Sequence, residues 1–137
     1  MIGAATVIVD DPDHVLLVKH SYGERNWELP GGRGEKGESA EETARREARE
    51  EVGLDLDDLR LTGVYWEPSA DMHHFVFRAR AAEQPRVADK NEITEIGWFS
   101  RDALPRPISD FTVRRIEDAL AGRPPAVTAI GDRVWLR

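Results

Sequence analysis

The sequence predicts an α/β (α+β) fold in which a mixed β-sheet is packed between helices, an α/β/α sandwich. Short segments rich in β-branched residues are interspersed with two segments of helical spacing, as expected when helices cover a sheet. The 137 residues match the length of one ordinary domain, and 40% of them are hydrophobic, enough to bury a core. We therefore expect residues 1–137 to form a single domain.

The N-terminal part of the chain is expected to supply three strands. Residues 2–9 and 15–18 are apolar and largely β-branched, and the Asp-Asp-Pro-Asp sequence of residues 10–13 favours a turn between them. Residues 26–29 read as a short strand that ends at Pro30, and a glycine-rich loop follows.

A helix is predicted over residues 40–52. Ser39 can cap its first turn, and Glu42 can complete a capping box. Gly53 suits the left-handed conformation that ends a helix. Small apolar residues at i+4 spacing predict one face packed on the sheet, namely Ala40, Ala44, Ala48 and Val52.

The C-terminal part is expected to add strands over residues 59–66 and 72–79, joined by a turn at 68–71. Residues 82–94 are polar and predict a loop, and residues 95–100 predict a short strand.

The last part of the chain has the spacing of a helix over residues 109–121, ended by Gly122. The tail over residues 126–136 is interpreted as a hairpin that turns at Gly131 and Asp132.

Composition argues against several classes of protein. The net charge of −7 disfavours nucleic-acid polymers as partners, but it permits a small anionic substrate where metal ions and local Arg or Lys reverse the sign. The lack of cysteine removes disulfides and thiolate metal sites and fits a cytoplasmic location. No apolar run approaches the roughly 20 residues of a membrane span, and no secretory signal opens the chain, so no membrane partner is expected.

The acidic residues of the first helix break the rules of local stability. Glu47, Glu50 and Glu51 are spaced i, i+3 and i+4, so they share one helix face and repel one another. They also crowd the last turn, where the helix dipole favours cations. A bound hard cation is the simplest compensation, and oxygen ligands without Cys or clustered His suit Mg²⁺ or Mn²⁺.

The segment from Gly32 to Leu54 resembles the Nudix box, G-x5-E-x7-R-E-U-x-E-E-x-G-U, where U is a bulky apolar residue. The preceding Trp-Glu-Leu-Pro-Gly-Gly at residues 27–32 resembles the lead-in of many MutT-type Nudix hydrolases. The box departs from the pattern only at Ala48, where a larger aliphatic residue is usual. The resemblance implies a Nudix fold over the whole chain.

The resemblance implies hydrolysis of a pyrophosphate bond in a nucleoside diphosphate linked to another group X, by water that a divalent metal activates. A (deoxy)nucleoside triphosphate is the favoured small-molecule substrate, and ADP-ribose or a nucleotide sugar is the alternative within the enzyme class. Two other readings stay open: a catalytically idle Nudix domain that senses nucleotides, and an acidic helix that binds Ca²⁺ or a partner. Relatives commonly form homodimers, so a homodimer is also possible here.

Residue roles follow the positions of the box. Glu47, Glu50 and Glu51 are the expected metal ligands and catalytic residues, and Glu38 is a further ligand or holds the loop. Arg46 is expected to orient these carboxylates. The general base is either a box glutamate or an acid of a later loop, Glu92 first and Glu95 second.

Several residues are candidates for substrate binding. Arg25 and Arg33 flank the lead-in and could meet phosphates, as could Lys19. The backbone of Gly31 and Gly32 can approach the helix and the metal closely. Aromatic residues could stack on a base, with Trp66 favoured over Tyr65 and Phe111. We assign His73 and His74 to structural roles, and Trp98 and Phe99 to the core.

Overall fold

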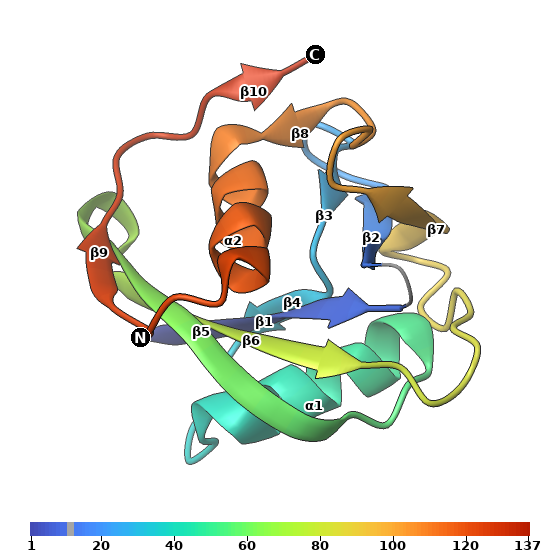
Figure 1. Ribbon diagram of the computed structural model, residues 1–137, viewed down its shortest axis with the longest axis horizontal. Coiled ribbons are helices and arrows are strands. Elements are labelled where there is room, and N and C mark those ends of the chain that lie inside the picture. Colours follow the sequence, from blue (N-terminus) through green and yellow to red (C-terminus); the bar gives the residue numbers. More distant parts are fainter. Residues whose placement is uncertain (11–12) are drawn as a thin grey trace.

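A curled, mixed sheet carries one helix on each face in the computed structural model, which describes residues 1–10 and 13–137 (Figure 1). Helix α1 (Ala40–Val52) contacts β1 and β4, and α2 (Asp110–Ala121) contacts β5, β6 and β8. The strands are β1 (Ile2–Val9), β2 (His14–His20), β3 (Trp27–Glu28), β4 (Gly31–Arg33), β5 (Asp57–Glu67), β6 (Met72–Arg80), β7 (Ile93–Ser100), β8 (Ile108–Ser109), β9 (Val127–Ala129) and β10 (Trp135–Leu136). The predicted mixed sheet between helices is confirmed.

Strand β1 lies at the centre of the sheet and is buried on both faces. It pairs in parallel with β6 along its whole length and antiparallel with β2 and β4. Its side chains alternate, so Val7 and Val9 belong to the core beneath α2, while Ile8 belongs to the core beneath α1. Burial from both sides explains why residues 2–9 form an almost continuous apolar run.

Helix α1 begins and ends where the sequence predicts. The Ser39 hydroxyl accepts a hydrogen bond from the Glu42 N–H, and the Glu42 carboxylate accepts one from the Ser39 N–H, which completes the capping box. Gly53 has φ +68 and ends the helix in the left-handed conformation. Ala44, Ala48 and Val52 are buried against the sheet.

The short strands and the tail differ from the prediction. The glycine-rich loop contains β4, and β8 precedes α2, because these two- and three-residue strands are defined by their partners and not by local sequence. The tail is not a hairpin. Strand β9 pairs in parallel with β5, and β10 pairs antiparallel with β8, so two long-range pairings replace the predicted local one.

Strand limits also shift by a few residues. Strand β7 begins at Ile93, so the predicted polar loop ends earlier, and β5 begins at Asp57. Asp11 and Pro12 of the predicted first turn lie outside the described residues. Neither helix of the described part is long and apolar enough to cross a membrane.

The capping box makes a testable contribution to stability. Replacing Ser39 with Ala removes the acceptor of the Glu42 N–H at the start of α1. We expect the free energy of unfolding in urea to fall by about 1 kcal/mol. The matched control is Ser69→Ala, an exposed serine of the turn at Pro68–Ala70, which should change it by less than about 0.5 kcal/mol. Equal effects of the two substitutions would contradict this account of the helix start.

Candidate active site

Helix α1 and strand β4 enclose two of the three glutamates on the acidic face of the helix. Glu51 is 4% exposed, and the Glu47 side chain one turn earlier is 15% exposed. The Glu50 side chain, by contrast, is 54% exposed. The predicted acidic face is therefore divided into a buried pair and one outer carboxylate.

A backbone N–H of the loop holds the Glu51 carboxyl group. Gly31 donates to Glu51 Oε1 at 2.8 Å. This approach requires glycine, because a Cβ at position 31 would lie 2.5 Å from the Ala4 carbonyl oxygen on β1. At position 32 a Cβ would lie 2.7 Å from Glu47 Oε1. The two glycines thus bring the loop backbone directly onto the glutamate pair.

Burial makes this pair a poor place for negative charge. Desolvation raises the pKa of Glu51 to about 9 against the hydrogen bond from Gly31, and the neighbouring Glu47 raises it further. Desolvation also raises the pKa of Glu47, with Arg46 acting in the opposite direction. Both pKa values are raised, so two negative charges at this pair are unfavourable when no cation is bound.

Arg46 links the remaining carboxylates of the site. Its guanidinium donates to Glu38 Oε2 at 2.7 Å, to Glu47 Oε1 at 2.9 Å and to Glu50 Oε2 at 3.2 Å. It also donates to the Arg33 carbonyl oxygen at 3.0 Å and thereby fixes the loop. Arg46 is the main cause that lowers the pKa of Glu38 to about 2. Arg46 therefore contacts three carboxylates and the loop, and its orienting role stays a prediction.

The donor set fits a hard divalent cation better than any softer metal. All candidate ligands are carboxylate oxygens. Arg46 is the positive group that pairs with Glu47, and no ion pair of the described residues neutralises Glu51. In the described part of the chain, no three acidic or histidine side chains are already arranged around one metal position. Glu47 and Glu50 are instead hydrogen-bonded to the Arg46 guanidinium. Glu38 instead binds Arg46, Thr43 and the loop.

A cavity of about 310 Å³ opens beside this loop, and we call it the loop cavity. Gly31, Gly32 and Arg33 form the wall that it shares with the glutamates. The same residues were predicted to bind substrate, and the structure places all three at the cavity.

One side of the loop cavity is a buried ion pair. Arg115 of α2 is 5% exposed and donates to Glu28 Oε1 at 2.7 Å. The same oxygen accepts hydrogen bonds from the Thr112 hydroxyl at 2.8 Å and the Leu29 N–H at 2.7 Å. These bonds fix both charged side chains, as a buried pair requires.

Another part of the lining is organised by Glu67 at the end of β5. Glu67 accepts hydrogen bonds from Arg133 at 3.1 Å and from His74 Nε2 at 2.8 Å. Burial lowers the pKa of His74, so its ring is neutral near pH 7. Because a carboxylate only accepts, the Nε2 proton faces Glu67 and Nδ1 is left as an acceptor. His74 was predicted to be structural, yet it lines the cavity.

Two predicted substrate residues lie elsewhere. Arg25 is exposed in the turn before β3, with φ +51, and it does not line the loop cavity. Trp66 stacks on His73, with ring centroids 4.5 Å apart. Alternation along β5 puts Trp66 on the face opposite to Glu67, so Trp66 does not reach the cavity either.

Glu92 lies at the rim of the site. It is exposed just before β7, and its carbonyl oxygen accepts a hydrogen bond from the Ser21 N–H at 2.9 Å. Burial raises the pKa of Tyr22, and the charge of Glu92 raises it further. His20 and Tyr22 both line the loop cavity, so the Glu92 backbone is bonded to the residue between two cavity residues.

Five polar lining residues of the cavity were not predicted as site residues from the sequence, namely the charged Glu28, Glu67, Arg115 and Arg133 and the neutral His74. Only Glu28 carries a signal in the sequence, since it lies inside the lead-in before the glycines. The other residues come from β5, β6, α2 and the tail, and nothing in their spacing indicates that they meet.

Comparisons with known proteins agree with this arrangement. A family model described as the NUDIX domain matches residues 1–119. A Bacillus subtilis (strain 168) protein named as a candidate 8-oxo-dGTP diphosphatase is 36% identical over 117 residues, which cover 85% of this chain and 77% of that protein. The 8-oxo-dGDP phosphatase NUDT18 of Mus musculus is 35% identical over 107 residues, covering 74% of this chain and 33% of that longer protein. The crystal structure of a MutT NUDIX hydrolase from Burkholderia pseudomallei superimposes with a TM-score of 0.72 at 29% identity, covering 85% of this chain and 95% of that one.

The raised pKa of Glu51 predicts how stability depends on pH without metal. Its value rises from 4.5 to about 9 on folding, so the folded state holds a proton that the unfolded state releases in this window. Stability should therefore fall as pH rises between these values, and Glu51→Gln should remove much of the fall. In EDTA at about pH 8.5, we expect the variant to be more stable than the wild type by at least about 1 kcal/mol in urea unfolding.

The exposed Glu41→Gln serves as the control and should follow the wild-type pH profile. Parallel profiles for Glu51→Gln and the wild type would contradict burial of an ionisable Glu51.

Proposed function

The chain belongs to the Nudix hydrolase family, and we propose that it hydrolyses a pyrophosphate bond in a nucleoside diphosphate linked to X, with (deoxy)nucleoside triphosphates as preferred substrates and Mg²⁺ or Mn²⁺ as cofactor. The buried Glu47–Glu51 pair carries this proposal. Two buried carboxylates destabilise the protein alone, and this cost is explained if they bind a divalent cation next to a diphosphate.

Glu47, Glu50 and Glu51 would hold the cation. When bound, a cation of this kind neutralises the carboxylates, polarises a phosphoryl oxygen and lowers the pKa of an attacking water. The chain itself contributes orientation. The Gly31 N–H fixes one oxygen of Glu51, and Arg46 keeps Glu47 and Glu50 on the same side of the helix. Glu47 and Glu50 would exchange their contacts with Arg46 for the cation, while Glu51 would keep its hydrogen bond from Gly31.

The loop cavity would receive the nucleoside. Its volume of about 310 Å³ lies at the lower end of the range for small-molecule sites, which favours one nucleoside over a dinucleotide. Arg33 and Arg133 supply positive charge within it, and His74 supplies an acceptor. The names of two relatives refer to oxidised guanine nucleotides, and this supports a nucleoside phosphate as substrate.

Metal-dependent hydrolysis is the first expected outcome. With a broad nucleotide panel, phosphate release should require Mg²⁺ or Mn²⁺ and stop in EDTA. Glu51→Gln and Glu47→Gln should lower kcat at least about 10²-fold, because each removes a charged ligand. The exposed Glu41→Gln on the same helix should retain activity. Full activity in Glu51→Gln would refute the assignment.

Glu92 is proposed as the general base or an added ligand, because its backbone is hydrogen-bonded to Ser21, between the cavity residues His20 and Tyr22. Glu92→Gln should lower kcat by about 10²-fold or more and leave KM nearly unchanged. Glu83→Gln, an exposed acid of the same segment before β7, is the matched control. A loss below about threefold would remove Glu92 from this role and return it to a box glutamate.

The substrate class can be decided by comparing kcat/KM within one panel that contains dNTPs and their oxidised forms, ADP-ribose, NADH, dinucleoside polyphosphates and nucleotide sugars. The size of the loop cavity predicts the highest value for a nucleoside triphosphate. Preference for ADP-ribose or a nucleotide sugar would replace the substrate class but leave the reaction unchanged. Tight binding of a nucleotide with no turnover would instead favour a sensor.

A further inference from the structure

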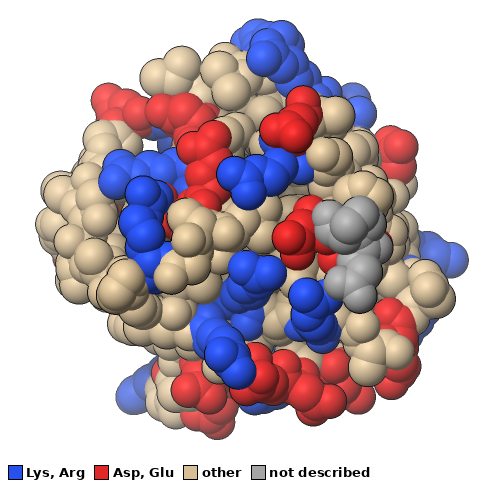
Figure 2. Space-filling model, in the orientation of Figure 1, with Lys and Arg blue, Asp and Glu red and all other residues tan. Residues whose placement is uncertain are grey.

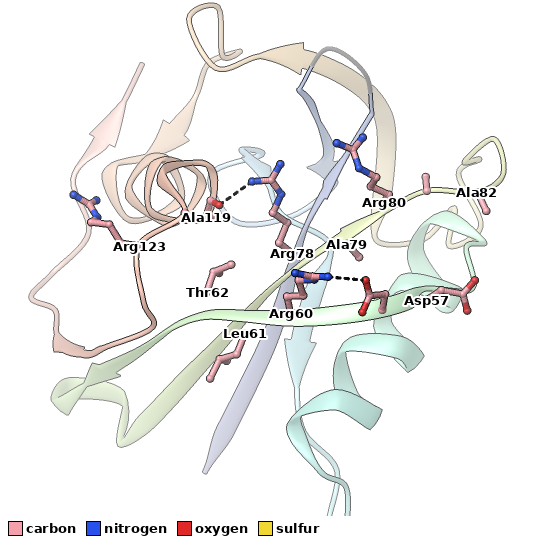
Figure 3. A pocket seen from close by; sticks show the side chains of 13 residues that line it. Asp57, Arg60, Leu61, Thr62, Arg78, Ala79, Arg80, Ala82, Ala119 and Arg123 are labelled. Atoms are coloured by element: carbon pink, nitrogen blue, oxygen red, sulfur yellow. Dashed lines mark hydrogen bonds and ion pairs between the residues drawn. The ribbon is translucent and has the colours of Figure 1, made fainter.

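A second cavity, of about 640 Å³, lies at the other end of α2, and we call it the arginine cavity. It is formed by the C-terminal end of α2, the first half of β5 and the last half of β6 (Figure 3). Among the described residues, it shares no lining residue with the loop cavity. Arg115 of α2 lines the loop cavity and Ala119, one turn later, lines the arginine cavity, so the helix separates the two.

Four arginines line this cavity: Arg60, Arg78, Arg80 and Arg123. Arg78 and Arg80 are two residues apart on β6 and therefore share a face of the sheet. Arg60 of β5 lies directly opposite Arg78 in the antiparallel pairing. Figure 3 shows Arg78 extending from β6 toward the end of α2, beyond which Arg123 lies.

This placement is unfavourable for the sheet alone. Like charges at directly opposed positions of two strands destabilise the pairing. The arginines gather here although the chain has more acidic than basic residues and a net charge of −7. A local rule broken without gain to the fold indicates a functional site.

Within the described residues, Arg60 and Arg78 make only long ion pairs, and Arg123 pairs with Asp118 at 3.0 Å through a side chain that is 70% exposed. Arg60 and Asp58 are 3.5 Å apart, with both side chains more than three-quarters exposed. Arg78 donates to the Ala119 carbonyl oxygen at 3.2 Å and pairs with Asp13 only at 3.5 Å. Exposed pairs of this kind contribute from nothing to about 1 kcal/mol, so an anionic ligand can replace them easily.

We propose that the arginine cavity binds an oligophosphate, the phosphate chain of a nucleotide or of an inorganic polyphosphate. Guanidinium groups pair with phosphate oxygens through two parallel hydrogen bonds, and arginines spread over three elements can engage several phosphates at once. A ligand with a single carboxylate would leave most of the four arginines without an anionic partner. The volume fits a molecule of nucleotide size.

The surroundings of the cavity favour a small ligand over a nucleic-acid polymer. Figure 2 shows basic side chains gathered where β5 and β6 pass beneath α2, with acidic side chains along the lower rim of the same face. Asp57 and Asp58 are part of the lining. A long polyanion would have to cross these carboxylates, whereas a short phosphate chain fits between them.

The experiment is calorimetric titration of the full chain in EDTA with tripolyphosphate, ATP and inorganic phosphate. The titration measures binding, and EDTA suppresses the metal-dependent hydrolysis, so the result does not depend on the proposed function. We expect tripolyphosphate and ATP to bind at least about tenfold more tightly than inorganic phosphate, since only they span several arginines. Equal affinity for tripolyphosphate and ATP would assign recognition to the phosphate chain alone, and tighter ATP binding would add the nucleoside to it.

The variants Arg60→Gln and Arg123→Gln change exposed side chains on two separate elements, so the second keeps the test valid if one fails to fold. Each should weaken tripolyphosphate binding at least about fivefold. The control Arg49→Gln removes an exposed arginine on α1 that also pairs with an aspartate, and it should stay within about twofold.

Three results would overturn the proposal. Unchanged affinity in both cavity variants would place the ligand elsewhere. An equal loss in Arg49→Gln would reduce the binding to general electrostatics. Tighter binding of a single-stranded RNA oligomer than of tripolyphosphate, with the same sensitivity to Arg60→Gln, would replace the oligophosphate by a polynucleotide.

Discussion

The burial of two adjacent glutamates against a loop backbone is the constraint on which the site depends. Glu51 and Glu47 lie one helical turn apart, under a loop that touches both. Burial raises the pKa of both groups, so two negative charges at this place are unfavourable for the protein alone. A divalent cation would neutralise them, and this is the basis of the proposed metal site.

The fold provides that constraint through the contact between β1 and β4. Their antiparallel pairing sets Gly31 against Ala5 and Gly32 against Ala4, and side chains larger than hydrogen do not fit there. Arg46 then ties the helix to the loop through the Arg33 carbonyl oxygen. The same loop forms a wall of the loop cavity, so the candidate metal ligands and the proposed substrate pocket share one short segment of backbone.

The parts predictable from sequence are those encoded over one or two helical turns. The limits of α1, its capping box and the positions of the box residues are local, and the structure reproduces them. The ion pair of Glu28 with Arg115 joins residues 87 apart in sequence, and Glu67 with Arg133 joins residues 66 apart. The spacing of residues along the chain does not indicate such long-range pairs.

The predicted hairpin in the tail was wrong for the same reason, because β9 pairs with β5 and β10 pairs with β8, both distant in sequence. Trp66 was predicted to bind substrate, but the sequence did not determine which face of β5 its side chain would occupy.

Direct metal binding tests whether the buried Glu47–Glu51 pair holds a divalent cation. Electron paramagnetic resonance of free Mn²⁺ during titration would report the dissociation constant for the wild type, Glu51→Gln and the surface control Glu41→Gln. We expect the wild type and the control to bind Mn²⁺ alike, and Glu51→Gln to bind at least about tenfold more weakly. Equal Mn²⁺ affinity in Glu51→Gln and the wild type would refute this role of the pair.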